Sequence, residues 1–173
     1  MKKRIIEIKK NESRELVINE EGDYYLELTG EGAQIRVSGA LTACGSDSLK
    51  INVVVVHKAK KTSSDIFIRA TVKDRARVVL AGLIKVESGS EGVCAFLRED
   101  VLLLSERAKA EVIPNLEIST DEVKVSHAAT VGRIDEEQVF YLRSRGLTKE
   151  KAEELISGGF LQEALDRAGQ YDI

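Results

Sequence analysis

The chain has 173 residues, of which 43% are apolar and 32% are charged, and its formal net charge at pH 7 is -3. This length can bury a core without disulfides or a structural metal, and the small net charge gives no support for a nucleic-acid partner. Two cysteines without a CxxC pair do not make a disulfide framework, and no apolar run reaches the length of a membrane span. We therefore expect a reduced, cytoplasmic protein with no membrane span and no nucleic-acid partner.

Apolar residues alternate with polar ones from about residue 24 to residue 125. A period of two places each set on one face of a strand, and the many β-branched residues suit a pleated surface. The pattern predicts that the first three-quarters of the chain is all β. The side chains expected to point inward include Tyr24, Ile35, Ile51, Ile68, Val78 and Leu103.

A weak internal repeat accompanies the alternation. An Asp followed by alternating residues, a turn, an Ala and a second alternating run occurs at 23–35, 65–78 and 100–110. Two strands and a corner per unit are typical of a stacked β-solenoid, in which each coil buries its apolar side against the next. An antiparallel sandwich has the same alternation and polar turns, so the repeat alone leaves both architectures open.

After Gly132 the pattern becomes helical. Asp135 is a candidate N-cap and Gly146 a stop, and Thr148 then begins a second helix. Gly158 and Gly159 are predicted to end that helix, and a third helix is predicted over 160–167. We therefore divide the chain into a β domain at 1–132 and a small C-terminal helical subdomain at 133–173.

Several ordered sequence words resemble the SufB/SufD family, the scaffold subunits of an iron–sulfur cluster assembly machine. They are the element His57, Thr62 and Ser64, and the segments 82–86, 102–110, 113–118 and 121–146, the last containing Gly132 and Gly146. Ala128 follows His127, and Glu99 stands where the SufB branch has a cysteine, so the chain is similar to the SufD branch. The resemblance implies a right-handed parallel β-helix closed by C-terminal helices, and it favours the solenoid over the sandwich.

The same resemblance implies partners and a cargo. The family pairs with a like subunit, here a second copy or a SufB-like paralogue, and its C-terminal helices hold an ABC-type ATPase. We expect His127 and Cys44 to be candidate metal ligands for iron or a transiently bound iron–sulfur cluster, and Cys94 to be a small buried residue. Aromatic and arginine residues of the tail are the predicted partner-binding set: Phe140, Tyr141, Arg143, Arg145 and Phe160.

The sequence contains no Walker loop, no HExxH and no GxSxG word. We therefore expect a non-catalytic scaffold or accessory subunit of iron–sulfur cluster assembly. Two alternatives stay open at this point. One is a structural interaction protein of the same fold that binds no cluster, and the other is a small metal-dependent enzyme built around His127.

Overall fold

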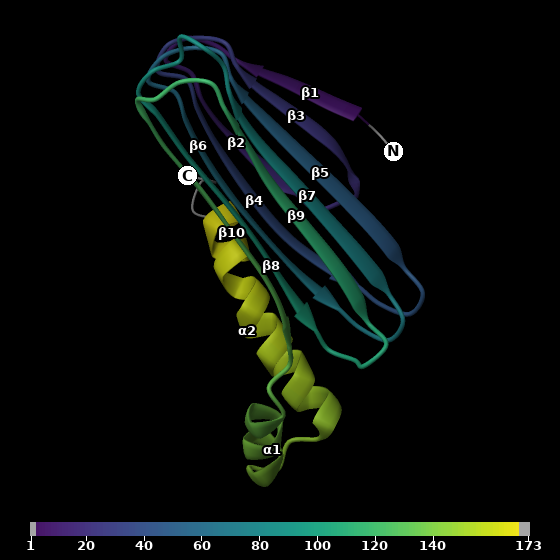
Figure 1. Ribbon diagram of the computed structural model, residues 1–173. Coiled ribbons are helices and arrows are strands. Elements are labelled where there is room, and N and C mark those ends of the chain that lie inside the picture. The colour runs from purple at the N-terminus through teal and green to yellow at the C-terminus, as the bar shows by residue number, and fades with distance from the viewer. Residues whose placement is uncertain (1–2, 170–173) are drawn as a thin grey trace.

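The computed structural model describes residues 3–169 and consists of ten strands followed by two helices (Figure 1). Odd and even strands alternate along the chain, so each coil contributes one strand to each of two sheets. The strands of the first sheet are β1 (Lys3–Ile8), β3 (Gly22–Leu28), β5 (Ser48–His57), β7 (Arg77–Val86) and β9 (Lys109–Ile118). Those of the second are β2 (Ser13–Ile18), β4 (Gln34–Ala43), β6 (Ser63–Val72), β8 (Val93–Leu103) and β10 (Val123–Arg133).

Every strand pair among these ten is parallel. The sheet orders are β1-β3-β5-β7-β9 and β10-β8-β6-β4-β2, with no strand out of sequence order. Strands that pair only with the strand two places away in the chain define a solenoid, because a sandwich pairs its strands antiparallel. The expected β-solenoid is confirmed, and it extends from β1 to β10, beyond the predicted limits of 24 and 125.

Residues in successive coils lie in register. Gly22 is opposite Ile51 and Ser48 is opposite Arg77, so a coil is 29 residues long in this part of the chain. The predicted repeat is correct for its second and third copies, where Ala76 and Ala108 both lie in the turn that follows an even strand. It is wrong for its first copy, because segment 23–35 begins in an odd strand and the other two begin in even strands.

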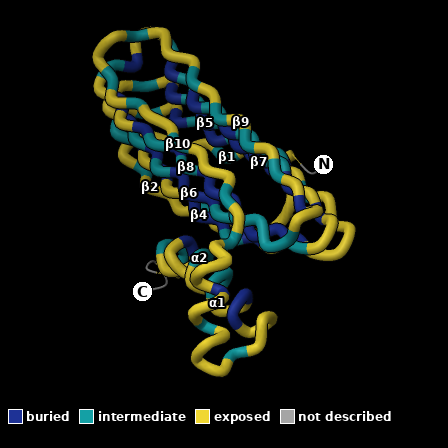
Figure 2. Tube along the Cα trace, turned by 60° about the horizontal axis from the view of Figure 1, so that its bottom comes forward, coloured by how far each residue is buried: buried dark blue, intermediate teal, exposed yellow. Residues whose placement is uncertain are grey.

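The core lies between the two sheets and is built from the alternate residues that face inward (Figure 2). Five of the six predicted inward residues are buried, and Leu103 is partly buried against the same core. Because parallel strands stay in register, an inward residue in one coil lies over an inward residue in the next. The buried sides of the coils therefore form one continuous apolar cluster.

The turns between strands also stack. The Asp74 side chain accepts a hydrogen bond from the Gly45 amide at 2.9 Å, and the Ser105 hydroxyl accepts one from the Asp74 amide at 3.0 Å. At the opposite end of the strands, a Cβ atom on Gly30 would lie 2.0 Å from the backbone nitrogen of Lys10. Only glycine allows these two turns to approach so closely.

Two helices follow the solenoid, α1 (Glu136–Ser144) and α2 (Lys149–Gly169). The predicted starts of both helices are confirmed. Asp135 caps α1 by accepting a hydrogen bond from the Glu137 amide at 2.9 Å, and the Thr148 hydroxyl accepts one from the Lys151 amide of α2 at 3.2 Å. Gly146, with φ of 95°, follows α1 in the left-handed conformation that glycine favours.

The prediction of a break at Gly158 and Gly159 is wrong, because α2 runs through both residues. A glycine inside a helix costs about 1 kcal/mol relative to alanine, and contacts elsewhere can offset that cost. In Figure 1, α2 lies along the outer side of the even-strand sheet and α1 projects beyond the strand ends. The partners of α2 in the solenoid are β4 and β6.

The last coil, β9 and β10, is the more open end of the core. Val112, Leu116, Val123 and Val125 pack against the core but are only partly buried, because no further coil covers them. β9 and β10 are also the terminal strands of their sheets, so each has one backbone edge that no described strand pairs with. The inner surface of the solenoid is therefore accessible at this end.

Candidate functional site

His127 lies in β10, on the inner surface of the open last coil. Its register partner in β8 is Leu97, which is fully buried in the core, and parallel partners face the same side of the sheet. His127 is nonetheless exposed, because the last coil has nothing stacked on it. The imidazole is thus accessible at the mouth of the solenoid.

The second predicted metal candidate, Cys44, is far from His127. Cys44 follows β4 in line with Lys73, whereas His127 is in line with Leu97, Ile66 and Val37. The two positions differ by seven residues in the direction of the strands and by three strands in the direction across the sheet. They are therefore roughly 25 Å apart. The structure therefore does not bring these two predicted ligands into one site.

Cys94 is exposed, which corrects the expectation that it is buried. Its neighbours Val93 and Ala95 face inward and are buried, so the alternation of β8 places Cys94 on the outer face. Cys44 is exposed as expected, and its thiol lies 3.8 Å from an oxygen of Asp47. Among residues 3–169, no group of three or more His, Cys, Asp or Glu side chains could hold a metal ion.

Glu99 is the residue at this end of the core that sequence reasoning did not select as a site residue. It follows Leu97 on the inner face of β8 and is fully buried, and neither carboxyl oxygen has a hydrogen-bond partner within the described part of the chain. Its register partner in β10 is Ala129, two residues from His127 on the same face. A carboxyl and an imidazole therefore lie on adjacent strands of the inner surface.

Gly82 gives the Glu99 carboxyl its space. A Cβ atom on Gly82 would lie 3.2 Å from Oε1 of Glu99 and 2.4 Å from a methyl carbon of Leu97. Burial disfavours the charged form and raises the pKa of Glu99 from 4.5 to about 7. The alternation already contained a signal for this residue, because Glu99 is a charged residue between the inward positions of Leu97 and Val101.

The predicted structural element of His57, Thr62 and Ser64 is a buried hydrogen-bonded corner. Nδ1 of His57 lies 2.7 Å from the Thr62 hydroxyl, and Nε2 lies 3.0 Å from the Ser64 hydroxyl. Burial lowers the pKa of His57 from 6.5 to about 4, so the ring is neutral at pH 7. Both ring nitrogens are occupied by hydrogen bonds to hydroxyl groups, so this histidine has a structural role.

The predicted partner-binding residues divide into two groups. Phe140 and Tyr141 of α1 are 72% and 56% exposed, and Arg143 and Arg145 are exposed beside them. The Arg145 guanidinium lies over the Tyr141 ring at 5.2 Å. Phe160 instead faces the solenoid, where its ring lies 4.8 Å from the guanidinium carbon of Arg69. The projecting helix α1 therefore presents the free aromatic surface of the tail.

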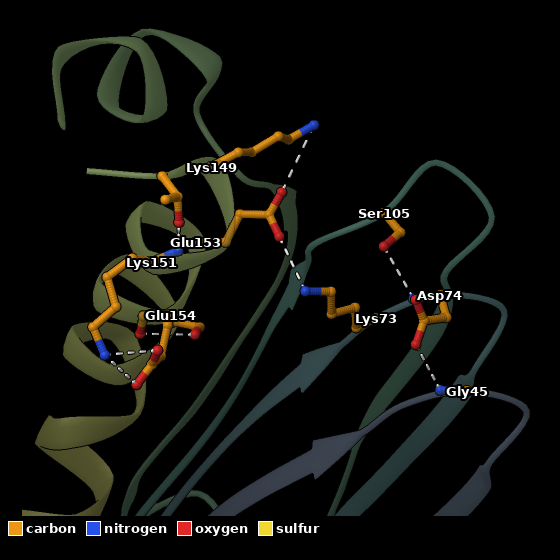
Figure 3. Close-up of polar contacts among 10 residues, drawn as sticks. Gly45, Lys73, Asp74, Ser105, Lys149, Lys151, Glu153 and Glu154 are labelled. Atoms are coloured by element: carbon orange, nitrogen blue, oxygen red, sulfur yellow. Dashed lines mark hydrogen bonds and ion pairs between the residues drawn. The ribbon is translucent and has the colours of Figure 1, made fainter. Parts of the chain in front are cut away.

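A polar cleft of about 640 Å³ separates the strand-end turns from the start of α2. Figure 3 shows the Glu153 carboxylate between two lysines, Lys73 from the solenoid at 3.1 Å and Lys149 from the helix at 3.8 Å. The cleft wall also contains Asp74 and Ser105 from the stacked turns. The wall carries charges of both signs, and Glu153 is already engaged by two lysines, so we assign the cleft no ligand.

Comparison with known proteins shows the family of the chain. Residues 17–160 match the family model for the SUF system FeS cluster assembly, SufBD core domain. The iron-sulfur cluster assembly protein SufD of Bacillus subtilis (strain 168) is 35% identical over 134 residues, and that of Escherichia coli (strain K12) is 34% identical over 137 residues. An iron-sulfur cluster assembly SufBD family protein of Staphylococcus saprophyticus is 33% identical over 135 residues.

The chain therefore belongs to the SufBD core domain family of SUF system iron–sulfur cluster assembly proteins. The alignments cover 78% and 79% of this chain but only 31% and 32% of the two SufD proteins, so the chain spans about a third of their length. Neither helix in the described range 3–169 combines the length and the apolar character needed to cross a membrane.

The buried Glu99 carboxyl makes stability depend on pH. Between pH 4.5 and about 7 the native state keeps the proton on Glu99 and the unfolded chain does not, so stability falls as pH rises through this range. We predict that Glu99→Gln increases the free energy of unfolding by about 3 kcal/mol above pH 7, and that this gain disappears below pH 4.5. Urea unfolding over a pH series measures the difference.

A matched control is Glu111→Gln, which removes a surface carboxylate that pairs with Arg77 at 3.0 Å. An exposed pair contributes little, so the pH profile of this variant should stay close to that of the wild type. A stability gain in Glu99→Gln that is equal at every pH would contradict the assignment, because it would come from packing and not from ionisation.

Proposed function

We propose that this chain acts in iron–sulfur cluster assembly as a cytoplasmic, non-catalytic scaffold or accessory subunit that works with an ABC-type ATPase. The observation that carries the proposal is the open end of a SufBD core domain, with His127 on the inner surface of its last coil and the buried Glu99 one coil deeper on the same face. The names of its SufD relatives support the role in assembly.

The inner surface of the last two coils suits iron as a cargo. Imidazole and carboxylate both ligate iron, and thiolates dominate the ligands of clusters. His127 and Glu99 supply the first two kinds of ligand, whereas Cys44 and Cys94 do not face this surface. We therefore propose that a partner subunit at the last coil completes the site, either a second copy of this chain or a SufB-like paralogue.

Self-association through the last coil also follows from its exposed surface. Open strand edges promote pairing with another chain, and both β9 and β10 have one. Their inward residues Ile118 and Val131 are 45% and 46% exposed and would be covered by a second coil. A two-fold homodimer about this coil is the arrangement that we propose when no paralogue is present.

We predict that sedimentation at tens of micromolar shows a dimer that Val131→Lys converts to monomer, because a lysine there places a charge in the covered surface. The control is Val17→Lys, which changes a valine that is 48% exposed on β2 at the other end of the solenoid and should leave the dimer intact. A monomeric wild type under these conditions would contradict the proposed self-association.

We predict that anaerobic reconstitution with iron and sulfide, followed by visible absorption, shows iron retained by the wild type and lost in His127→Ala. The thermal midpoint and the dimer should be nearly unchanged, because an exposed imidazole contributes little to folding. The control is His57→Gln, which alters the buried corner and should lower stability without removing iron from folded protein. If the wild type retains no iron, the chain is better described as a structural interaction protein of the same fold, which is the alternative function.

The tail is the proposed contact for the ATPase. Exposed aromatic and arginine residues concentrate binding energy at interfaces, and α1 presents Phe140, Tyr141 and Arg143 on a helix that projects away from the solenoid. Pocket-lining contacts support this, since Phe140 and Arg143 line one groove of α1 and Tyr141 lines another together with Ile156 of α2.

We predict that Phe140→Ala and Tyr141→Ala each weaken ATPase binding by about 2 kcal/mol, the cost typical of hot-spot side chains. Isothermal titration with a cognate ATPase measures the loss, and the thermal midpoint should stay within about 2 °C because both rings are exposed. Leu165→Ala is the control, since Leu165 is 48% exposed on α2 away from α1. Equal binding by all three variants would exclude α1 as the contact.

A further inference from the structure

The long helix α2 attaches to the solenoid through a row of charged contacts. It lies antiparallel to β6, because Glu153 near its start pairs with Lys73 at 3.1 Å and Arg167 near its end pairs with Asp65 at 3.3 Å. Lys73 follows the end of β6 and Asp65 lies near its beginning. The outward row of β6 and one side of the helix are therefore joined by charge at both ends.

Arg69 holds the centre of this contact. Its Nη1 donates to the Phe160 backbone carbonyl at 2.7 Å, and its Nη2 pairs with Glu163 at 2.6 Å. The guanidinium also lies between two rings, 4.9 Å from Phe67 of the sheet and 4.8 Å from Phe160 of the helix. A single side chain thus makes a hydrogen bond, an ion pair and a cation–π contact with α2, and a second cation–π contact within the sheet.

The sheet surface beneath α2 is shaped to receive a helix. Phe67 is 1% exposed although it points outward from β6, and the Arg167 guanidinium lies 4.2 Å from its ring. The neighbouring outward residues of β4 are small, and they include Ser38 and Ala40. The docked helix, together with Arg69 and Arg98 of the sheet, therefore buries Phe67.

Apolar packing contributes to the same contact mainly through half-buried side chains such as Phe160 and Leu161. The residues of α2 that are buried are Ala152, Glu153 and Ala164, two small side chains and one carboxylate. The large residues Leu155 and Leu165 are 58% and 48% exposed. Two glycines in its middle lower the intrinsic stability of the helix. Charge and cation–π contacts are therefore a large part of the attachment of α2.

We propose that α2 is a charge-docked arm, which releases from β4 and β6 in an opening that is separate from unfolding of the solenoid. Salt promotes the release, because partly exposed ion pairs are screened as the ionic strength rises. Release uncovers Phe67 and allows α1 and α2 to move together relative to the sheets. The arm and its latch at Arg69 are properties of the chain alone and do not depend on the proposed role in cluster assembly.

Hydrogen exchange of the full chain, followed by mass spectrometry, tests the proposal. Between about 20 mM and about 1 M NaCl, where the screening length falls to about 3 Å, protection of amides in peptides from α2 should fall at least about tenfold, while peptides from β5, β6 and β7 keep their protection. Arg69→Met and Glu163→Gln should each reproduce part of this loss at low salt. Glu163 is half exposed on the helix, so its variant leaves the sheet undisturbed.

The matched control is Arg77→Met, which removes an arginine of β7 that pairs with Glu111 on the odd-strand sheet, the sheet on which α2 does not lie. It should leave α2 protection within about twofold of the wild type at both salt concentrations. The proposal is overturned if salt and Glu163→Gln both leave α2 protection unchanged, or if α2 exchanges only together with β5, β6 and β7. Either result would make the helix an integral part of the solenoid.

Discussion

The in-register stacking of parallel coils is the constraint on which the rest of the structure depends. Gly22, Ile51 and Leu80 are register partners in three successive coils. Because partners face the same side, a residue that faces inward in one coil requires an inward residue in the next. A slip of one residue would expose a whole row of the core. The turns obey the same spacing, and the hydrogen bonds that join Gly45, Asp74 and Ser105 repeat it outside the sheets.

The proposed functional surface lies at the end of the solenoid, where the stacking of coils stops. The alternation that buries Leu97 in β8 also points His127 inward in β10, but no coil lies beyond β10 in the described chain. A position that would be core in the middle of the solenoid is therefore accessible at its end. Glu99, one coil deeper, keeps the burial of a core residue together with a group that can accept a proton or bind a cation.

The strands and their inward residues could be predicted from the sequence, because alternation is a local signal and Tyr24, Ile51 and Ile68 obey it. The length of the helices could not, because Gly158 is a stop only when no other contacts hold the helix, and Arg69 lies 89 residues earlier in the chain than Gly158. The contact of Phe160 with the solenoid could not be predicted either, because its partner Arg69 is also distant in the sequence.

Candidate ligands show a similar division between local and distant information. The buried corner of His57 involves residues within seven positions of each other, and the sequence placed it correctly as a strand-end histidine. The separation of Cys44 from His127 depends on three strand registers, which no local pattern records.

Pro114, the chain's sole proline, has a further consequence at the open end. It lies in the edge strand β9 opposite Gly82 and cannot donate a backbone hydrogen bond. The two free edges of the solenoid's mouth are therefore unequal, and a strand from another molecule finds an uninterrupted ladder of donors on β10 but a gap in the corresponding ladder of β9.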